Sequence, residues 1–411
     1  MSAADARAGL VETRSTRVCD TGLELACGRR LDAVTVAYEC YGRLNEARDN
    51  AILVCHALSG GAHAAGWHDG AAKPGWWDAM IGPGKAFDTD RYFVVSSNVL
   101  GSCYGTTGPA SVDPATGRPF GSRFPVVTIG DMVNVQRALV ESLGIRRLRA
   151  VAGGSMGGMQ ALAWAVWQPE AVQSVIALAT SPRHSPQQIA FNEIARRAVM
   201  SDPHWRGGDY YDGEPPRSGL ALARMLGHVT YLSDRGMERK FGRRLRTGGL
   251  QYGFGREFEV EGYLDHQGQS FVDRFDANSL LYLTRAIDYF DLVPAGGTLA
   301  DAFTGSDASF LFLTFSSDWL YPPYHLEGVA DAAAAAGRPV RYREIPSDYG
   351  HDAFLLEHEA QEPLVRAFLG DGDRYNPERH SNLEPPQPCP SRRAAVERTC
   401  SPLACGPAPA P

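Results

Sequence analysis

The sequence predicts an α/β fold, in which a mostly parallel sheet carries helices on both faces and is interrupted by an inserted helical cap. Three observations predict it. Short apolar runs alternate with segments of helical spacing. A glycine-rich turn at 153–157 joins one such run to a helical segment, and residues 186–291 show helical periodicity without a convincing buried strand. A chain of 411 residues is long enough for one such core with a large insertion.

The expected elements follow in chain order, beginning with an N-terminal leader at 1–30. The first part of the core, 31–185, is expected to hold strands at 33–41, 51–55, 92–99, 148–152 and 174–179, with helices at 131–143 and 159–167. The helical cap is expected at 186–300. The second part of the core, 301–370, is expected to hold a strand at 309–315, a helix from Tyr324, a strand at 340–345 and a last helix at 352–369. A proline-rich tail, 371–411, is expected to be disordered.

Composition narrows the classes of partner. The formal net charge is −7 and no dense block of Lys and Arg is present, so neither a nucleic acid nor an anionic membrane surface is expected as a partner. We expect small-molecule substrates instead. No apolar run approaches the ~18 residues of a spanning helix, and the N-terminus lacks the apolar stretch of a signal peptide. These features predict a cytoplasmic protein.

The turn at 153–157 reads G-x-S-x-G, which is typical of a nucleophile elbow. Glycines two positions either side of Ser155 are required because a Cβ in so tight a strand-to-helix turn would collide with backbone. A plain glycine-rich turn is the alternative. The strand expected before the turn and the helix expected after it favour the nucleophile.

A serine nucleophile needs a base to take its proton and a carboxylate to orient that base. In α/β-hydrolases the chain order is Ser, then Asp or Glu, then His. Asp318 and His351 fit this order, since each follows a predicted parallel strand at the sheet edge where such folds place their sites. Asp318 could instead cap a helix, and His351 could be an ordinary surface histidine. The order and the elbow favour a triad of Ser155, Asp318 and His351.

The developing oxyanion needs two backbone N–H donors. The first is that of Met156, directly after the nucleophile. The second is expected in the loop after the strand at 51–55, where Leu58 is the best candidate, although it could be an ordinary loop leucine. The same loop contains three histidines without an accompanying carboxylate pair, so we expect no metal site; these are His56, His63 and His68.

Seven ordered blocks closely resemble the homoserine O-acyltransferases of methionine biosynthesis, a family with the α/β-hydrolase fold. They read C-H-A-L-S-G-G-A-H-A-A-G at 55–66, K-P-G-W-W-D at 73–78, G-T-T-G-P-A-S at 105–111, F-P-V-V-T-I-G-D-M-V at 124–133, G-G-S-M-G-G-M-Q-A-L at 153–162, R-F-D-A-N at 274–278 and G-H-D-A-F-L-L-E at 350–357. The resemblance extends over about residues 15–370 and leaves the tail unmatched.

The resemblance implies an α/β-hydrolase fold with the triad on Ser155, Asp318 and His351, and an oxyanion loop at Leu58. It also implies a homodimer and two substrate contacts. Arg224 matches the arginine that holds the carboxylate of the amino acid, and Asp352 matches the carboxylate expected near its amino group. From the residues alone, Arg224 would be a solvated helix arginine and Asp352 a helix N-cap.

Relatives with this fold transfer acetyl or succinyl groups, and the resemblance places an arginine two positions after the triad aspartate in those that transfer succinyl. Leu320 occupies that position here. Burying a succinyl carboxylate against leucine would be costly, whereas an acetyl methyl needs only an apolar wall. Leu320 therefore predicts acetyl specificity, unless Arg217, Arg274 or another cap residue reaches the same space.

The function predicted is transfer of an acetyl group from acetyl-CoA to the γ-hydroxyl of L-homoserine through an acetyl-serine intermediate. Acetyl-CoA is the donor substrate, and no bound cofactor is expected. Three alternatives stay open: a succinyl transfer to homoserine or serine, a serine esterase, and a non-catalytic binding module.

Overall fold

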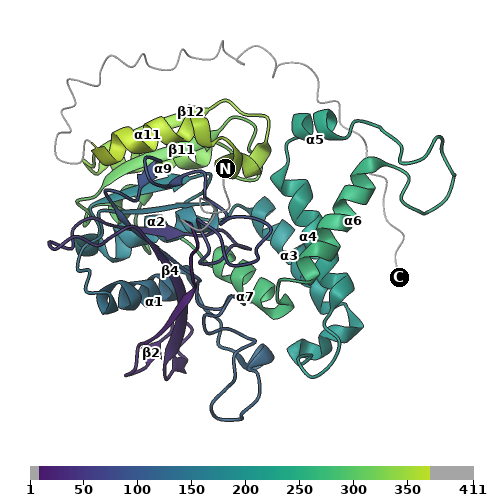
Figure 1. Ribbon diagram of the computed structural model, residues 1–411, viewed down its shortest axis with the longest axis horizontal. Helices are drawn as coiled ribbons and strands as arrows, with labels where there is room; N and C mark the ends of the chain where they lie inside the picture. The colour runs from purple at the N-terminus through teal and green to yellow at the C-terminus, as the bar shows by residue number, and fades with distance from the viewer. Residues whose placement is uncertain (1–8, 371–411) are drawn as a thin grey trace, which may run out of the picture. The chain divides into compact units, whose positions relative to one another are not determined.

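The computed structural model describes residues 9–370. The predicted disordered tail at 371–411 and the first eight residues of the leader lie outside this part of the chain. Within it, the predicted α/β architecture is confirmed (Figure 1).

The main sheet has eight strands in the order β1-β4-β8-β5-β9-β10-β11-β12. Their bounds are β1 Arg14–Val18, β4 Val34–Tyr41, β8 Phe93–Ser97, β5 Ala51–Cys55, β9 Ala150–Gly154, β10 Ser174–Leu178, β11 Ser309–Phe315 and β12 Val340–Ile345. The pairs β1/β4 and β4/β8 are antiparallel, and all other neighbours are parallel. Two short ribbons flank the sheet: β2 Leu23–Glu24 with β3 Arg30–Leu31, and β6 Ile81–Gly82 with β7 Phe87–Asp88.

The central strands are apolar throughout because both faces of the sheet are covered. Every residue of β5 is buried, with Leu53 in the core layer on one face and Ile52 and Val54 in the layer on the other. The first layer is completed by α1 Ile129–Ser142, α2 Met156–Trp167 and α9 Tyr324–Ala335, and the second by α10 Ala353–Leu356 and α11 His358–Gly370. This arrangement leaves the carboxyl ends of the parallel strands to form the site.

Six α-helices lie between β10 and β11 in the chain, and those from α3 to α6 gather beside the sheet (Figure 1). Their bounds are α3 Pro186–Met200, α4 Arg217–Tyr231, α5 Asp234–Lys240, α6 Glu259–Val272, α7 Ala277–Asp288 and α8 Leu299–Ala302. The insertion begins with a strong signal: Ser185 and Gln188 form a capping box, and Pro186 takes the first helical position. The cap boundaries at 186 and 300 stay a prediction.

The expectation of one continuous helix at 352–369 was wrong. Gly350–Asp352 forms a 3-10 turn, and α10 is separated from α11 by Glu357, whose ψ of 43° is not helical. The tight turn places His351 beside Asp318. This contact depends on the tertiary structure, so the apolar periodicity of the sequence does not indicate it. Between residues 9 and 370, no helix is long and apolar enough to cross a membrane.

Candidate active site

Ser155 occupies a strained turn between β9 and α2, with φ 57° and ψ −125°. The neighbouring glycines make the turn possible, since a Cβ on Gly157 would overlap the carbonyl oxygen of Cys55. Two hydrogen bonds hold the strained residue: its N–H donates to Leu178 O at 3.0 Å, and its carbonyl accepts from Thr180 Oγ1 at 2.8 Å. The geometry is that of a nucleophile elbow.

Asp318 and His351 are brought together from the ends of β11 and β12. His351 Nδ1 lies 2.8 Å from Asp318 Oδ2, and both residues are buried, so His351 is not a surface histidine. The other carboxylate oxygen of Asp318 accepts from the N–H groups of Leu320 at 3.0 Å and Tyr321 at 2.8 Å. Asp318 therefore caps a turn and orients the imidazole at once. With Nδ1 donating to this carboxylate, Nε2 is left available as a base.

The two predicted oxyanion donors flank the serine. Met156 is the first residue of α2, where N–H groups have no partner inside the helix and the helix dipole favours negative charge. Leu58 lies in the loop after β5 and lines the same cavity as Ser155. Among the residues described, no backbone hydrogen bond occupies the N–H of Leu58 or Met156.

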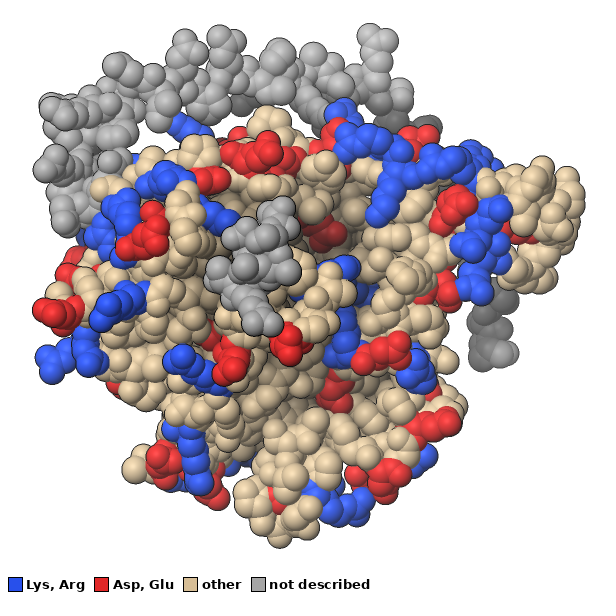
Figure 2. All heavy atoms as spheres, viewed as in Figure 1, with Lys and Arg blue, Asp and Glu red and all other residues tan. Residues whose placement is uncertain are grey.

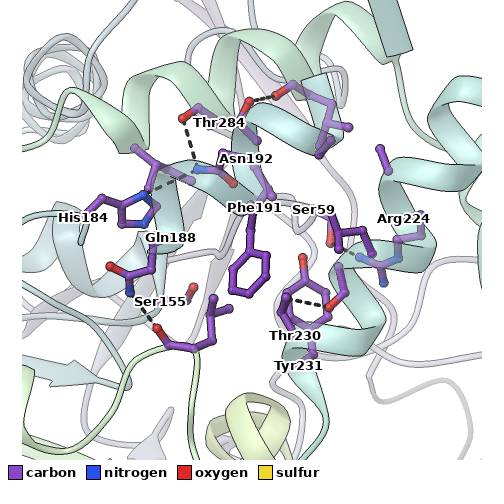
Figure 3. Close-up of a pocket in the computed structure, with 18 of the residues that line it drawn as sticks. Ser59, Ser155, His184, Gln188, Phe191, Asn192, Arg224, Thr230, Tyr231 and Thr284 are labelled. Atoms are coloured by element: carbon purple, nitrogen blue, oxygen red, sulfur yellow. Dashed lines mark hydrogen bonds between the residues drawn. The ribbon is translucent and has the colours of Figure 1, made fainter. Parts of the chain in front are cut away.

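A cavity opens at Ser155, between the sheet and the helices that follow β10. In Figure 3, Ser59, Arg224, Thr230 and Tyr231 lie on one side of it, and His184 and Gln188 on the other. Leu320 also lines it, held in place because Gln188 Nε2 donates to the Leu320 carbonyl at 2.7 Å.

Arg224 is the only Arg or Lys among the described residues that line this cavity. One terminal N–H group donates to Ser59 Oγ at 3.3 Å, and the guanidinium lies 4.7 Å from the ring centroid of Phe271 and 5.6 Å from that of Tyr231. Its Nε is buried without a hydrogen-bond partner, and no carboxylate forms an ion pair with Arg224 in residues 9–370. Burial lowers its pKa. The charge of Asp352 acts on Arg224 without a direct ion pair, so this partly buried cation is suited to binding an anionic ligand.

Asp352 directly follows His351 and interacts electrostatically with Arg224. Burial raises the pKa of Asp352, while the charges of His351 and Arg224 oppose that effect. The other candidate arginines have partners of their own: Arg217 pairs with Asp273 at 2.7 Å. Arg274 donates to the Tyr104 hydroxyl at 2.9 Å and to the Ser59 carbonyl, at the edge of the cavity, at 3.3 Å. Neither lines the cavity beside Leu320.

The loop histidines do not gather into one group. His56 is buried, accepts from the N–H of Val99 at 3.1 Å, and has a pKa lowered by burial to about 4. His63 and His68 lie 3.0 and 2.8 Å from different oxygens of Glu39, a buried partner that sequence reasoning missed. Their rings stack at 3.7 Å with 28° between planes. One ligand atom from each of Glu39, His63 and His68 lies within 4.8 Å of the other two, so the structure brings together a group that could hold a metal ion, which the sequence did not predict. Glu39 is therefore the common hydrogen-bond partner of His63 and His68.

Sequence reasoning also missed Tyr321 and His184, which line the cavity beside Ser155. The only local signal was the position of Tyr321, three residues after Asp318. On the face shown in Figure 2, basic and acidic side chains are interspersed over most of the surface, and basic side chains gather at the upper right.

This chain is similar in sequence both to a broad fold family and to individual relatives. A family model for the alpha/beta hydrolase fold matches residues 50–358. A homoserine O-acetyltransferase of Methanohalobium evestigatum is 55% identical over 362 residues, which cover 88% of this chain and 74% of that relative. A homoserine O-acetyltransferase of Deferribacter desulfuricans is 54% identical over 362 residues, covering 88% of this chain and 96% of the relative.

Solved structures with this fold include transferases and hydrolases. The homoserine O-acetyltransferase of Bacillus anthracis superposes with a TM-score of 0.82 at 31% identity, covering 88% of this chain and 98% of that one. Esterase E22 superposes with a TM-score of 0.80 at 33% identity, covering 87% of this chain and 100% of its own. The fold is therefore shared by both reaction classes, and the residues around the serine must distinguish them.

Proposed function

This chain belongs to the homoserine O-acetyltransferases, a family with the α/β-hydrolase fold, and from that premise we propose how its residues act. The protein transfers an acetyl group from acetyl-CoA to the γ-hydroxyl of L-homoserine, giving O-acetyl-L-homoserine, an acyltransferase step of methionine biosynthesis. The observation that carries the proposal is the cavity itself, which holds an elbow serine and a partly buried arginine whose Nε has no hydrogen-bond partner.

The first half-reaction acetylates the enzyme. Ser155 Oγ attacks the thioester carbonyl while His351 takes the hydroxyl proton, and Asp318 stabilises the imidazolium that forms. The N–H groups of Leu58 and Met156 hold the tetrahedral oxyanion. The C–S bond then breaks, the proton passes from His351 to the thiolate, and coenzyme A leaves with the acetyl group remaining on Ser155.

The second half-reaction transfers the acetyl group. His351 takes the γ-hydroxyl proton of homoserine as its oxygen attacks the acetyl carbonyl, and the same N–H groups hold the second oxyanion. The ester bond to Ser155 breaks, and His351 returns the proton to Oγ. Transfer exceeds hydrolysis only if water is kept from the acetyl-serine, and we assign that role to the helices over the cavity.

Two residues select the acceptor. The planar guanidinium of Arg224 suits bidentate binding of the homoserine carboxylate, and Asp352 suits the ammonium group. These contacts favour an amino-acid acceptor over water, which an esterase would use.

Leu320 selects the donor. It presents an apolar wall beside Tyr321, and no described lysine or arginine other than Arg224 lines the cavity. A succinyl carboxylate would then compete with homoserine for Arg224, which favours acetyl-CoA.

Three further features are part of the proposal. The enzyme needs no bound metal or cofactor, since the triad and backbone donors supply acid–base and electrostatic catalysis. It is a cytoplasmic homodimer, an assembly that the family resemblance supports and that light scattering after size-exclusion chromatography would measure.

The test follows thiol release from acetyl-CoA with and without L-homoserine. We expect release to rise steeply with homoserine, and mass spectrometry after acetyl-CoA alone to find acetyl on Ser155. Ser155→Ala should abolish both. Homoserine-independent hydrolysis would instead support an esterase, and a preference for succinyl-CoA in a parallel assay would overturn the assignment of Leu320.

A further inference from the structure

Three side chains that can ligate a metal ion meet outside the cavity at Ser155. Glu39 lies on β4, whereas His63 and His68 lie in the loop that follows β5. One ligand atom from each lies within 4.8 Å of the other two, and none of the three residues lines the cavity. The sequence predicted no metal site because no carboxylate pair accompanies the loop histidines in the chain. The structure adds a carboxylate to them from β4.

Glu39 is a buried carboxylate whose ion-pair partners are histidines. Its side chain is 0% exposed, and among the described residues it forms ion-pair contacts with His63 and His68 alone. The hydroxyls of Thr13 and Tyr41 donate to its two oxygens, each at 2.7 Å. Because a buried carboxylate is stabilised by pairing with a cation or by coordinating a metal, this position favours a bound cation.

The ligand atoms are spaced nearly as they would be around a zinc ion. Glu39 Oε2 lies 3.0 Å from His63 Nδ1, and Oε1 lies 2.8 Å from His68 Nε2. Ligands about 2.0–2.1 Å from a tetrahedral zinc ion lie ~3.3 Å apart. The two imidazole rings stack with centroids 3.7 Å apart, so they must rotate to direct both lone pairs at one ion. Their side chains are 23% and 37% exposed, which leaves room for this rotation and a path from solvent.

We propose that Glu39, His63 and His68 form a binding site for Zn²⁺, with water in the fourth position. Imidazole nitrogen and carboxylate oxygen suit zinc, whereas Mg²⁺ and Ca²⁺ prefer ligand sets made of oxygen. The ion replaces the ring protons that lie between each imidazole and Glu39, and these protons leave or move to the other ring nitrogen. The bound ion links β4 to the loop that carries Leu58 and takes no part in the transfer reaction.

The first experiment titrates the full-length protein, freed of metal by a chelator and dialysis, with ZnCl₂ in a calorimeter. We expect one zinc ion per chain, and X-ray absorption should show nitrogen and oxygen ligands at about 2.0–2.1 Å. Free zinc at about 100 times its Kd should lower the unfolding equilibrium constant about 100-fold in denaturant titrations. The same concentration of MgCl₂ or CaCl₂ should leave that constant unchanged.

Two substitutions each remove one ligand and keep a hydrogen bond to Glu39. Asparagine places an amide nitrogen where His63 has Nδ1, and glutamine places one where His68 has Nε2. His63→Asn and His68→Gln should each weaken zinc binding at least ~100-fold, because losing only a hydrogen-bond partner of a ligand costs about 10- to 100-fold. His204→Gln is the matched control and should bind zinc as wild type does. His204 also lies near a carboxylate, Glu214 at 3.8 Å, but has no third ligand among the described residues.

The outcomes that would overturn the site are distinct from changes in activity. Zinc held only by sulfur at about 2.3 Å would place the ion on cysteine instead. A zinc affinity within about threefold of wild type in either histidine variant would exclude that histidine as a ligand and refute the site. If one of the two variants does not fold, the zinc affinity of the other decides.

Discussion

Replacing Arg224 with methionine should separate substrate binding from acetylation of the enzyme. Methionine has a similar length and can pack on Phe271, which the guanidinium now covers. The substitution removes the only described arginine or lysine in the cavity without disturbing an ion pair. We therefore expect a specific loss of homoserine binding.

The magnitude follows from the contacts that the guanidinium offers. Its unpartnered Nε and its terminal nitrogens suit two parallel hydrogen bonds to a carboxylate. Losing one charge-assisted hydrogen bond costs about 1.5–3 kcal/mol, which corresponds to a ~10- to 100-fold higher KM for homoserine.

The assay compares two acceptors at saturating acetyl-CoA. With 3-aminopropan-1-ol, which lacks the carboxylate, wild type and Arg224→Met should have similar kcat/KM, whereas with L-homoserine they should differ. Arg217→Met is the control, since Arg217 pairs with Asp273 at the surface and should leave both acceptors unaffected. An unchanged KM for homoserine, or an equal loss with both acceptors, would refute the assigned contact.

Four further predictions test other parts of the site and its fold. Asp318→Asn should lower kcat about 10³- to 10⁴-fold in steady-state assays, because the histidine loses its orienting charge; near-normal turnover would exclude Asp318 from the triad. Leu320→Arg should raise the ratio of kcat/KM for succinyl-CoA over acetyl-CoA, and an unchanged ratio would exclude Leu320 as the selector. Gly157→Ala should lower the free energy of unfolding by more than about 3 kcal/mol, since the added Cβ would overlap backbone atoms. Gly328→Ala, in an open part of α9, should instead raise the free energy of unfolding by about 0.5–1 kcal/mol. Denaturant titration measures both changes, and a Gly157→Ala variant as stable as the wild type would contradict the packing at the turn. Asp352→Asn should raise the KM for homoserine yet stabilise the fold at pH 7: burial raises the pKa of Asp352 above 3.8, so the folded state binds this proton more tightly and loses stability as pH rises. The stability advantage of Asp352→Asn over the wild type should shrink as the pH is lowered. An advantage that grows in acid would contradict the predicted direction of the pKa shift.

The strands could be predicted from the sequence because a strand covered on both faces needs a continuous apolar run. The run at Ala51–Cys55 was assigned with its observed bounds. The last helix was less predictable, since its apolar periodicity continues through Glu357 while the backbone does not. The triad of Ser155, Asp318 and His351 could be predicted because each residue directly follows a predicted strand of the same parallel sheet.

The roles of Arg224 and Asp352 were inferred from family resemblance and stay predictions. The residues that surround them are brought together only by the tertiary structure. Nothing near Arg224 in the sequence indicates that Phe271 and Tyr231 enclose it. Glu39 was overlooked beside the loop histidines because it belongs to another strand.

The sequence by itself determined the layered α/β architecture, the strained turn at Ser155 and the chain order of its expected partners. All three depend on local propensity and on the rule that parallel strands end at one edge of a sheet. Only the tertiary structure brought Tyr321, His184 and Asp288 together beside the serine, because Tyr321 and His184 are 137 residues apart in the chain and His184 and Asp288 are 104 apart. Hydrogen bonds of a few ångströms between such distant residues depend on how whole elements pack, and no local pattern encodes them.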